Sequence, residues 1–122
     1  MMLAAVVVGA MLLTPQTAFA ENTGWVYTSD GNPGGKGVFD SRRDYMNVCD
    51  EQADGYGVVG TITNSYTGKQ LAYLRNSQGA GFCSIRGFDA KIPENIGVIF
   101  TVCLVNGRGP LRFCHAVTDI VS

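Results

Sequence analysis

The chain alternates between apolar and polar residues in short runs, which are bounded by glycine, asparagine, aspartate and proline. The clearest run is Ile96 to Val105, in which every second residue from Ile96 to Leu104 is apolar. Alternation with a period of two indicates an extended strand with one buried face, and no segment after residue 20 keeps a helical period over three turns. The pattern therefore predicts an all-β chain.

Seven or eight short strands are expected at a spacing of about 8–12 residues, which predicts a small antiparallel β-sandwich of the immunoglobulin-like or Greek-key kind. The glycine-rich segment 30–35 is expected to be a loop. Segment 87–95 is expected to be a crossing loop, because Pro93 lacks the N–H that a central strand requires. The expected strands cover residues 25–27, 38–39, 45–50, 56–63, 70–75, 82–85, 96–105 and 111–117.

The first twenty residues carry no charged side chain and have the layout of a secretory signal peptide. Leu3 to Leu13 is an apolar run, and the small residues Ala18 and Ala20 that follow fit the shallow pockets of a signal peptidase. The run is shorter than the about 20 residues that a helix needs to cross a bilayer. We therefore expect residues 1–20 to be removed on secretion and residues 21–122 to form one domain without a membrane span.

Charge is low and nearly balanced along the chain. Nine Lys and Arg residues against ten Asp and Glu residues give a formal net charge of −1, which excludes the basic surface of a nucleic-acid-binding domain. Signal peptides usually open with a basic residue, whereas this one opens with the uncharged pair Met1-Met2, so the sequence does not decide whether the true start lies upstream. A single histidine and four well-separated cysteines exclude most metal sites, and no cofactor is expected.

The four cysteines form an even set in a small exported chain, and such a set indicates two disulfides. A redox pair would need the spacing C-x-x-C, and a zinc site would need clustered ligands, and neither occurs. Four cysteines allow three pairings. A turn about Arg108-Gly109 sets Cys103 opposite Cys114 on facing strands, at bridging distance. The favoured pairing is therefore Cys103–Cys114 with Cys49–Cys83.

The densest acidic cluster is Asp50 to Gly55, and it is compatible with two kinds of site. An EF-hand calcium loop is rejected because its twelfth position is Thr61 and its flanks are strands. Asp50 and Asp54 are candidate ligands of a looser extracellular cation site, and the same two acids are candidates for a glycosidase pair. The favoured interpretation is that both side chains bond to backbone amides at the turn, so no metal site is predicted.

His115 is the only imidazole, and its alternation with Leu111, Phe113 and Val117 predicts a partly buried structural histidine. A serine triad would need a nucleophile elbow such as G-x-S-x-G, which the sequence lacks. Paired cysteines leave no thiol nucleophile. No catalytic residue is therefore predicted, and a hydrolase that uses His115 or the acidic cluster is an alternative.

Tyr66 is a candidate exposed contact, because it lies in a turn between Ser65 and Thr67 and exposed loop aromatics often bind. The other tyrosines and the tryptophan occupy strand positions, where core packing is expected to account for them. These residues are Trp25, Tyr27, Tyr45, Tyr56 and Tyr73.

A second candidate contact is the turn clamped by the expected Cys103–Cys114 bridge, with Arg108 at its tip. The pair Arg42-Arg43 is interpreted as solvated charge that Asp44 partly offsets. The residues of the candidate contact loop are Asn106, Gly107, Arg108 and Gly109.

Four short motifs follow one another within residues 38–116, namely V-C-D at 48–50, D-G-Y at 54–56, F-x-V-C-L at 100–104 and F-C at 113–114. This order resembles small secreted two-disulfide β-proteins of actinobacteria, which are described mostly as secreted or hypothetical proteins. The resemblance implies an all-β fold with two disulfides and a bacterial source, and it carries no activity. The small secreted amylase inhibitors of such bacteria are also two-disulfide β-proteins, but their Trp-Arg-Tyr contact motif is absent, since Val26 and Tyr27 follow Trp25.

These observations predict a secreted, non-catalytic and monomeric protein that acts outside the cell as a binding or interaction module. The expected partner is an extracellular protein or a cell-wall glycan, and not nucleic acid. The first alternative is an inhibitor of an extracellular protease or glycosidase that presents the disulfide-anchored loop 106–109 to an active site. The second alternative is a small secreted hydrolase.

Overall fold

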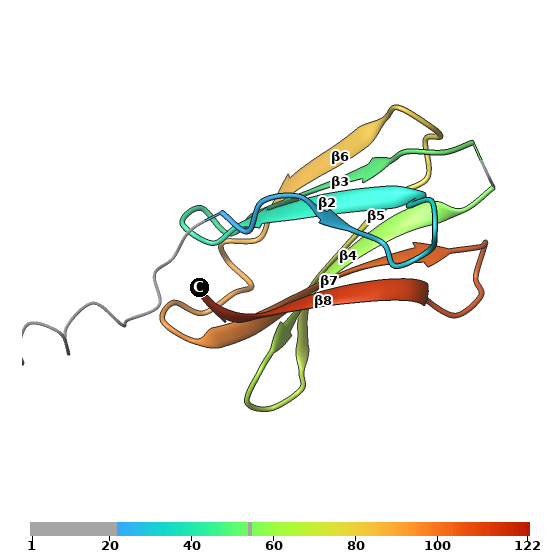
Figure 1. Cartoon of the computed structure of the whole chain (residues 1–122). Helices are drawn as coiled ribbons and strands as arrows, with labels where there is room; N and C mark the ends of the chain where they lie inside the picture. The colour runs from blue at the N-terminus through green and yellow to red at the C-terminus, as the bar shows by residue number, and fades with distance from the viewer. Residues whose placement is uncertain (1–21, 54) are drawn as a thin grey trace, which may run out of the picture.

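The computed structural model describes residues 22–53 and 55–122, and these residues form eight strands and no helix (Figure 1). The predicted signal peptide, residues 1–20, lies outside the described residues. The part of the chain that the structure describes thus holds no helix that could cross a membrane. The strands are β1 (Val26–Tyr27), β2 (Gly35–Asp40), β3 (Tyr45–Asp50), β4 (Gly57–Asn64), β5 (Gln70–Asn76), β6 (Cys83–Gly87), β7 (Gly97–Val105) and β8 (Arg112–Val121).

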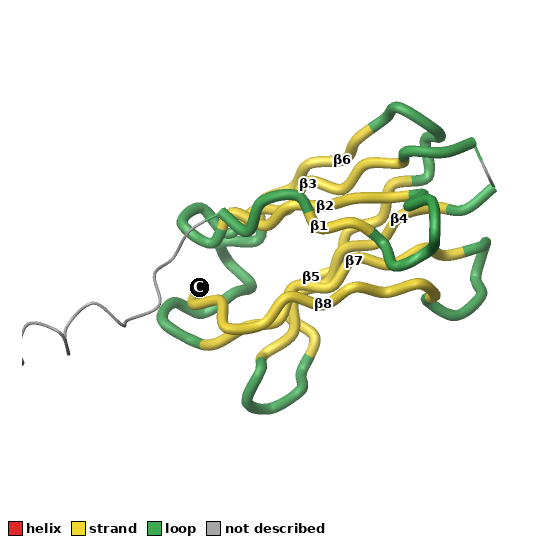
Figure 2. The backbone as a smooth tube through the Cα atoms, viewed as in Figure 1, coloured by secondary structure: helices red, strands yellow, loops and turns green. Residues whose placement is uncertain are grey.

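The strands form two antiparallel sheets of four strands each, which pack as two layers (Figure 2). The first sheet has the order β1-β2-β3-β6, and the second has the order β5-β4-β7-β8. The chain crosses between the sheets after β3, after β5 and after β6, the last time through residues 88–96, one residue later than the expected loop 87–95. The predicted small antiparallel β-sandwich is therefore confirmed.

The core lies between the two sheets and is built around β7. Val98, Phe100, Val102 and Leu104 are all buried, as the alternation predicts. From the facing sheet, Phe39 brings its ring centre to 6.0 Å from that of Phe100. Burying one large apolar side chain contributes about 1.5–3 kcal/mol, so the inward row of β7 is a main source of stability.

The strand β2 begins at Gly35, earlier than its apolar pair Val38-Phe39 predicts. The predicted end of the loop 30–35 is therefore wrong. Gly35 and Gly37 face the second sheet. A β-carbon at Gly37 would lie 3.0 Å from Cγ2 of Val102 and 3.1 Å from the ring of Phe100. These glycines therefore belong to the strand and permit the close approach of the two sheets.

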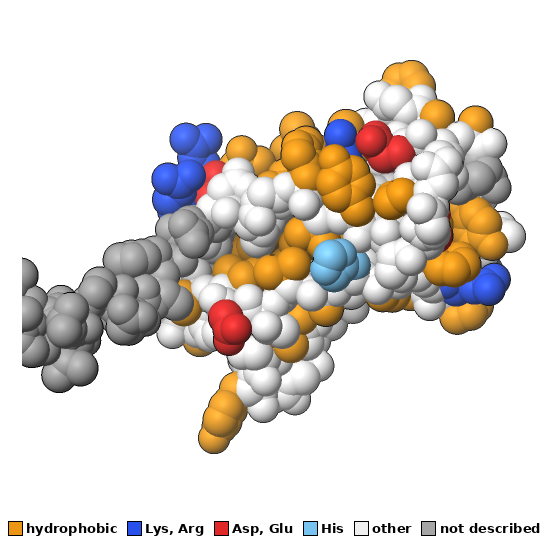
Figure 3. Space-filling model, in the orientation of Figure 1, with side chains coloured by type: hydrophobic (Ala, Val, Ile, Leu, Met, Phe, Trp, Pro, Cys, Tyr) orange, Lys and Arg blue, Asp and Glu red, His pale blue; other side chains and the backbone are white. Residues whose placement is uncertain are grey.

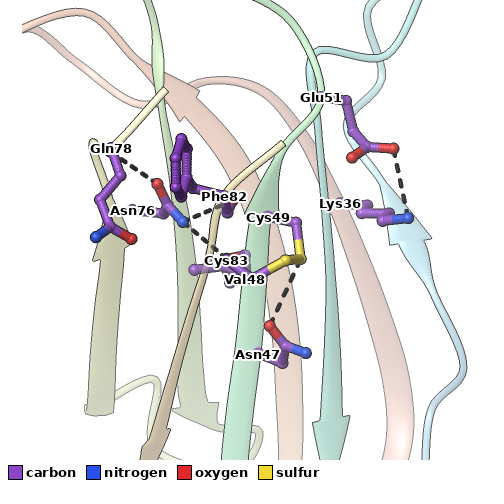
Figure 4. Close-up of a disulfide and its surroundings, with 9 residues drawn as sticks. All are labelled: Lys36, Asn47, Val48, Cys49, Glu51, Asn76, Gln78, Phe82 and Cys83. Atoms are coloured by element: carbon purple, nitrogen blue, oxygen red, sulfur yellow. Dashed lines mark hydrogen bonds and ion pairs between the residues drawn. A yellow bond between two sulfur atoms is a disulfide. The ribbon is translucent and has the colours of Figure 1, made fainter. Parts of the chain in front are cut away.

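Both predicted disulfides are confirmed. Cys49 and Cys83 are direct partners on β3 and β6, with Cα atoms 4.0 Å apart (Figure 4). Cys103 and Cys114 join β7 to β8, with Cα atoms 4.1 Å apart. Each bridge links neighbouring strands of one sheet, so the two sheets are held together by the apolar core and by the connecting loops.

The strand β8 departs from the predicted alternation. Its register against β7 shifts twice, and Phe113 and Asp119 have positive φ angles of 53° and 62°. Such irregularities redirect the side chains of an edge strand. Leu111, Phe113 and His115 are exposed, so the prediction of a partly buried His115 is wrong.

Contacts between β8 and β1 close one side of the sandwich. Nδ1 of His115 lies 2.9 Å from the carbonyl oxygen of Tyr27. The N–H of Ser29 donates to the carbonyl oxygen of Phe113 at 2.9 Å. The edges of the two sheets are therefore joined here by hydrogen bonds. These bonds occupy backbone groups that would otherwise be free to pair with another chain.

Candidate functional site

The outer surface of the first sheet carries large side chains from all four of its strands. Because strand residues alternate between faces, the neighbours of buried Val26 and Phe39 point outward. Tyr27 lies opposite Lys36, and Val38, Asn47 and Ile85 are successive partners across the sheet. We call this surface the aromatic face, and its members are Trp25, Tyr27, Lys36, Val38, Tyr45, Asn47, Ile85 and the Cys49–Cys83 disulfide.

The largest side chains of the aromatic face are open to solvent. Trp25 is 45% exposed, Tyr27 is 43% exposed and Ile85 is 64% exposed. The prediction that strand aromatics pack in the core is therefore wrong for Trp25 and Tyr27, and also for Tyr73, which is 43% exposed on the second sheet. A two-layer sandwich buries only the inner face of each sheet, so an apolar residue at an outward position stays at the surface.

Opposite charges border the aromatic face and cancel one another. Nζ of Lys36 lies 3.4 Å from Oε1 of Glu51, as Figure 4 shows, and 4.4 Å from the centre of the Trp25 ring. Figure 3 shows apolar side chains gathered over the first sheet beside one basic and one acidic side chain. A cation over an indole ring is attracted to its π-electrons, so Lys36 holds Trp25 in place and leaves this part of the face nearly neutral.

Four hollows of the described surface lie away from the aromatic face. A groove of about 410 Å³ between the edges of β5 and β6 is lined by residues that include Tyr73, Arg86 and Phe88. Trp25, Tyr27 and Ile85 line neither this groove nor three smaller hollows on the described residues. Small-molecule sites are concave, so the aromatic face suits a macromolecular partner better.

The β4–β5 hairpin projects from the sandwich (Figures 1 and 2), and Tyr66 in its turn is 96% exposed. Oδ1 of Asn64 accepts hydrogen bonds from the N–H groups of Tyr66 and Thr67, at 2.8 and 3.1 Å. The N–H of Gly68 donates to the carbonyl oxygen of Asn64 at 2.8 Å. The turn is therefore ordered without any packing of the Tyr66 ring, and a binding role for Tyr66 stays a prediction.

The candidate contact loop is an exposed turn, closed by a hydrogen bond of 2.9 Å from the N–H of Gly109 to the carbonyl oxygen of Asn106. Its centre is therefore Gly107-Arg108, one position before the predicted centre. A register shift in β8 compensates for this difference, so Cys103 and Cys114 still pair. Nη1 of Arg75 donates to the carbonyl oxygen of Gly107 at 2.8 Å. The loop is thus held at its base by a disulfide and along its side by a guanidinium group, and a contact role for Arg108 stays a prediction.

The residues considered for metal binding or catalysis have structural contacts. Asp50 is buried, and its Oδ1 accepts a hydrogen bond of 3.0 Å from the N–H of Gln52, the turn-capping role that the sequence favours. Asp54 lies outside the described residues. His115 places Nδ1 against the carbonyl oxygen of Tyr27. These contacts account for Asp50 and His115 without any reaction, and the expected lack of catalysis stays a prediction.

One buried carboxyl group is not among the candidate site residues predicted from the sequence. Asp44 is buried in the turn between β2 and β3, with a φ of 53°. The pKa of Asp44 is raised to about 6, first of all by burial. The charge of Glu94 and its hydrogen bond with Asp44 also contribute to this rise in pKa, as do the charges of Asp89 and Asp40. Only the folded chain brings Asp89 and Glu94 to this turn, so no local pattern could have shown the cluster.

Comparison of the chain with protein-family models, with curated proteins and with solved structures found no match. The resemblance to secreted proteins of actinobacteria therefore stays an expectation. The function has to be inferred from the geometry of the chain itself.

Proposed function

We propose that the protein is a secreted, extracellular binding protein that holds another protein against its aromatic face. The observation that carries this proposal is the joint exposure of Trp25, Tyr27 and Ile85 on one surface that has little net charge and lines none of the four hollows described above. Apolar patches exposed on a soluble protein often mark interaction sites. Tryptophan and tyrosine are enriched at the centres of protein interfaces, where they supply much of the binding free energy.

The surroundings of Trp25 favour a protein over a cell-wall glycan as the partner. Lys36 stands over one face of the indole ring, at 4.4 Å from its centre, which leaves at most the other face for stacking on a sugar. The Lys36–Glu51 pair lies beside the apolar side chains, in the manner of the polar rim around the core of a protein interface. The arrangement supports a flat contact with a second protein surface.

Two features support the extracellular compartment. The two disulfides are compatible with an oxidising environment outside the cell. The uncharged apolar segment at residues 3–13 and the small residues that follow it have the pattern of a secretory signal.

A capture experiment with matched surface variants tests the proposed function. The immobilised wild-type protein is incubated with culture fluid and, in parallel, with isolated cell walls, next to the variants Tyr27→Ala, Ile85→Asp and Tyr73→Ala. Tyr73 is the matched control, because its exposed fraction equals that of Tyr27 and it lies on the other sheet. We expect a protein partner that the wild type and Tyr73→Ala retain and that the two face variants retain at least about tenfold less.

Two outcomes contradict the proposal. One is a captured protein that all four forms retain equally, since its binding would not involve the aromatic face. The other is retention by purified glycan with no protein partner, which would replace the proposed partner by a polysaccharide.

A second function, inhibition of an extracellular hydrolase, is favoured by one observation. The loop Asn106–Gly109 is fixed by the Cys103–Cys114 bridge and by the 2.8 Å hydrogen bond from Arg75, and it leaves Arg108 exposed. In protease inhibitors, the loop that enters the active site is already rigid before binding. The test is an assay of trypsin-like proteases with the wild type, with Arg108→Ala and with the exposed control Arg43→Ala. Inhibition lost only in Arg108→Ala supports this function, and the absence of inhibition by the wild type eliminates it.

A further inference from the structure

The turn between β2 and β3 and the loop between β6 and β7 lie at the end of the sandwich that carries the C-terminus (Figures 1 and 2). Three carboxylates from these two segments come together. Asp44 comes from the turn between β2 and β3, whereas Asp89 and Glu94 come from the loop between β6 and β7. Oxygen atoms of the three side chains lie within 4.8 Å of one another. The N–H of Phe88 donates to the carbonyl oxygen of Asp44 at 2.7 Å, so a backbone hydrogen bond joins the two loops beside the cluster.

Asp44 gives this cluster a buried oxygen atom without a partner. The residue is only 1% exposed. Its Oδ1 is buried and accepts no hydrogen bond from any of the described residues. Buried polar atoms are almost always hydrogen-bonded in native proteins, and an exception indicates an ordered water, an ion or a functional role. Because the Asp44 carboxylate faces Asp89 and Glu94, a water that donates hydrogen bonds would leave three negative charges together, whereas a cation would neutralise them.

The protein itself does not balance the charge of this cluster. Asp40 adds a further carboxylate nearby and raises the electrostatic repulsion on Asp44. Arg42, close in sequence, pairs with Asp40 at 3.7 Å instead. Within the part of the chain that the structure describes, no Lys or Arg forms an ion pair with Asp44, Asp89 or Glu94. A bound cation would supply the missing positive charge.

We propose that Asp44, Asp89 and Glu94 bind a calcium ion. Calcium takes about six to eight oxygen ligands at about 2.3–2.6 Å, so two ligand oxygens on one ion are at most about 5 Å apart. The oxygen atoms of this cluster satisfy that limit. Magnesium requires a tighter octahedron and keeps most of its water, and zinc prefers nitrogen and sulfur ligands. A set of three carboxylates without nitrogen or sulfur therefore favours calcium.

The cluster is open to solvent on one side. Asp89 and Glu94 are exposed, and both line a hollow of about 360 Å³ that residues 89–94 form at the surface. An ion can enter from this side, and water can complete its coordination. Binding would tie the loop 88–96 to the turn between β2 and β3, and a ligand that binds only the folded state stabilises it.

The test combines thermal unfolding with calorimetric titration of calcium chloride into the full protein after treatment with EDTA. We expect one saturable site per chain, a rise in Tm with calcium and a Kd of about 10⁻⁴–10⁻³ M, the range of extracellular calcium modules. The double variant Asp89→Asn/Glu94→Gln should lose the rise in Tm and bind calcium at least about tenfold more weakly. Both side chains are exposed and keep their size as amides, so the variant retains the fold, which circular dichroism checks.

The single variant Asp89→Asn is measured beside the double variant, and Asp119→Asn is the control. Asp119 is an exposed acid on β8, and its substitution should leave the calcium response unchanged. The proposal is overturned by a wild-type protein whose Tm does not respond to calcium up to about 10 mM. A calcium response that persists in the double variant also overturns it, as does an equal response of the wild type to magnesium.

Discussion

A β-carbon added to Gly35 would lie 2.5 Å from Cγ2 of Val58, a separation that two non-bonded carbon atoms do not reach. Gly35 belongs to β2 of the first sheet, and Val58 belongs to β4 of the second. The two layers of the sandwich therefore approach each other closely at a point where the first sheet offers no side chain. The glycine content of this strand sets the distance between the sheets and, through it, the packing of the core.

Gly35→Ala should lower the free energy of unfolding by about 1–3 kcal/mol, because the added methyl group overpacks the contact with Val58. Urea denaturation measures the effect. Gly87→Ala is the control, since a β-carbon there meets no atom within 4 Å and the residue also lies in a strand. Equal stability of the two variants would show that the sheets do not depend on the glycine at position 35.

Removal of the two disulfides should destabilise the protein to different extents. The Cys49–Cys83 bridge closes a sequence separation of 34 residues, and Cys103–Cys114 closes one of 11. Loop-closure entropy then gives losses of about 3.8 and about 2.8 kcal/mol for the paired alanine variants. Guanidinium denaturation of the two double variants measures these losses. A clearly larger loss for the shorter loop would contradict this entropic account.

Asp44 should make the stability of the calcium-free protein fall as the pH rises from about 4 to about 6. The folded state raises the pKa of this carboxyl group from 3.8 to about 6, first through burial and then through Glu94, Asp89 and Asp40. Over this range the folded state therefore binds more protons than the unfolded state, and each unit of pKa difference corresponds to about 1.4 kcal/mol. The stabilisation is complete below the unfolded pKa and lost above the folded one, and its total is about 3 kcal/mol.

The comparison of the wild type with Asp44→Asn isolates this contribution. The amide keeps the size of the side chain and tolerates a positive φ, but it does not titrate. Urea denaturation in EDTA at several pH values should give a difference between the two proteins that changes across the stated window. Parallel pH profiles for wild type and variant would show that Asp44 titrates as it does in the unfolded chain.

Tyr66→Ala should leave the free energy of unfolding within about 0.5 kcal/mol of the wild-type value, as exposed substitutions usually do. The turn is held by Asn64 and not by the tyrosine ring. For comparison, Phe100→Ala should cost about 3–5 kcal/mol, because it empties the centre of the core. Thermal unfolding distinguishes the two. A Tyr66 variant destabilised by more than about 1 kcal/mol would mean that the ring packs within the fold and is not free for a partner.

Local patterns in the sequence were sufficient for the number of strands and for the Cys103–Cys114 disulfide, which left Cys49 and Cys83 as the second pair. The alternation from Ile96 to Leu104 determines the inner face of β7, and the turn near Arg108 brings Cys103 opposite Cys114. The same alternation fails in β8, because an edge strand with two register shifts does not keep its inward residues inward. The position of His115 follows from those shifts and not from its sequence neighbours.

The candidate sites depend on information that alternation does not contain. A period of two shows that Trp25 and Tyr27 share a face, but not whether another layer covers that face. The carboxylates of Asp44, Asp89 and Glu94 come from separate loops, and only the crossing of the chain between the sheets brings them together. Surfaces and clusters of this kind are properties of the tertiary structure.

The most direct test of the binding role uses Trp25 as a reporter, since it is the single tryptophan of the chain. Protein labelled with fluorotryptophan gives one fluorine NMR signal from the aromatic face, even when the partner contains tryptophan of its own. On addition of the captured partner, the signal should shift and broaden as the ring loses its contact with water, in the wild type and in Tyr73→Ala alike. A signal that stays unchanged while the partner is bound at saturation would contradict the assignment of the aromatic face as the binding surface.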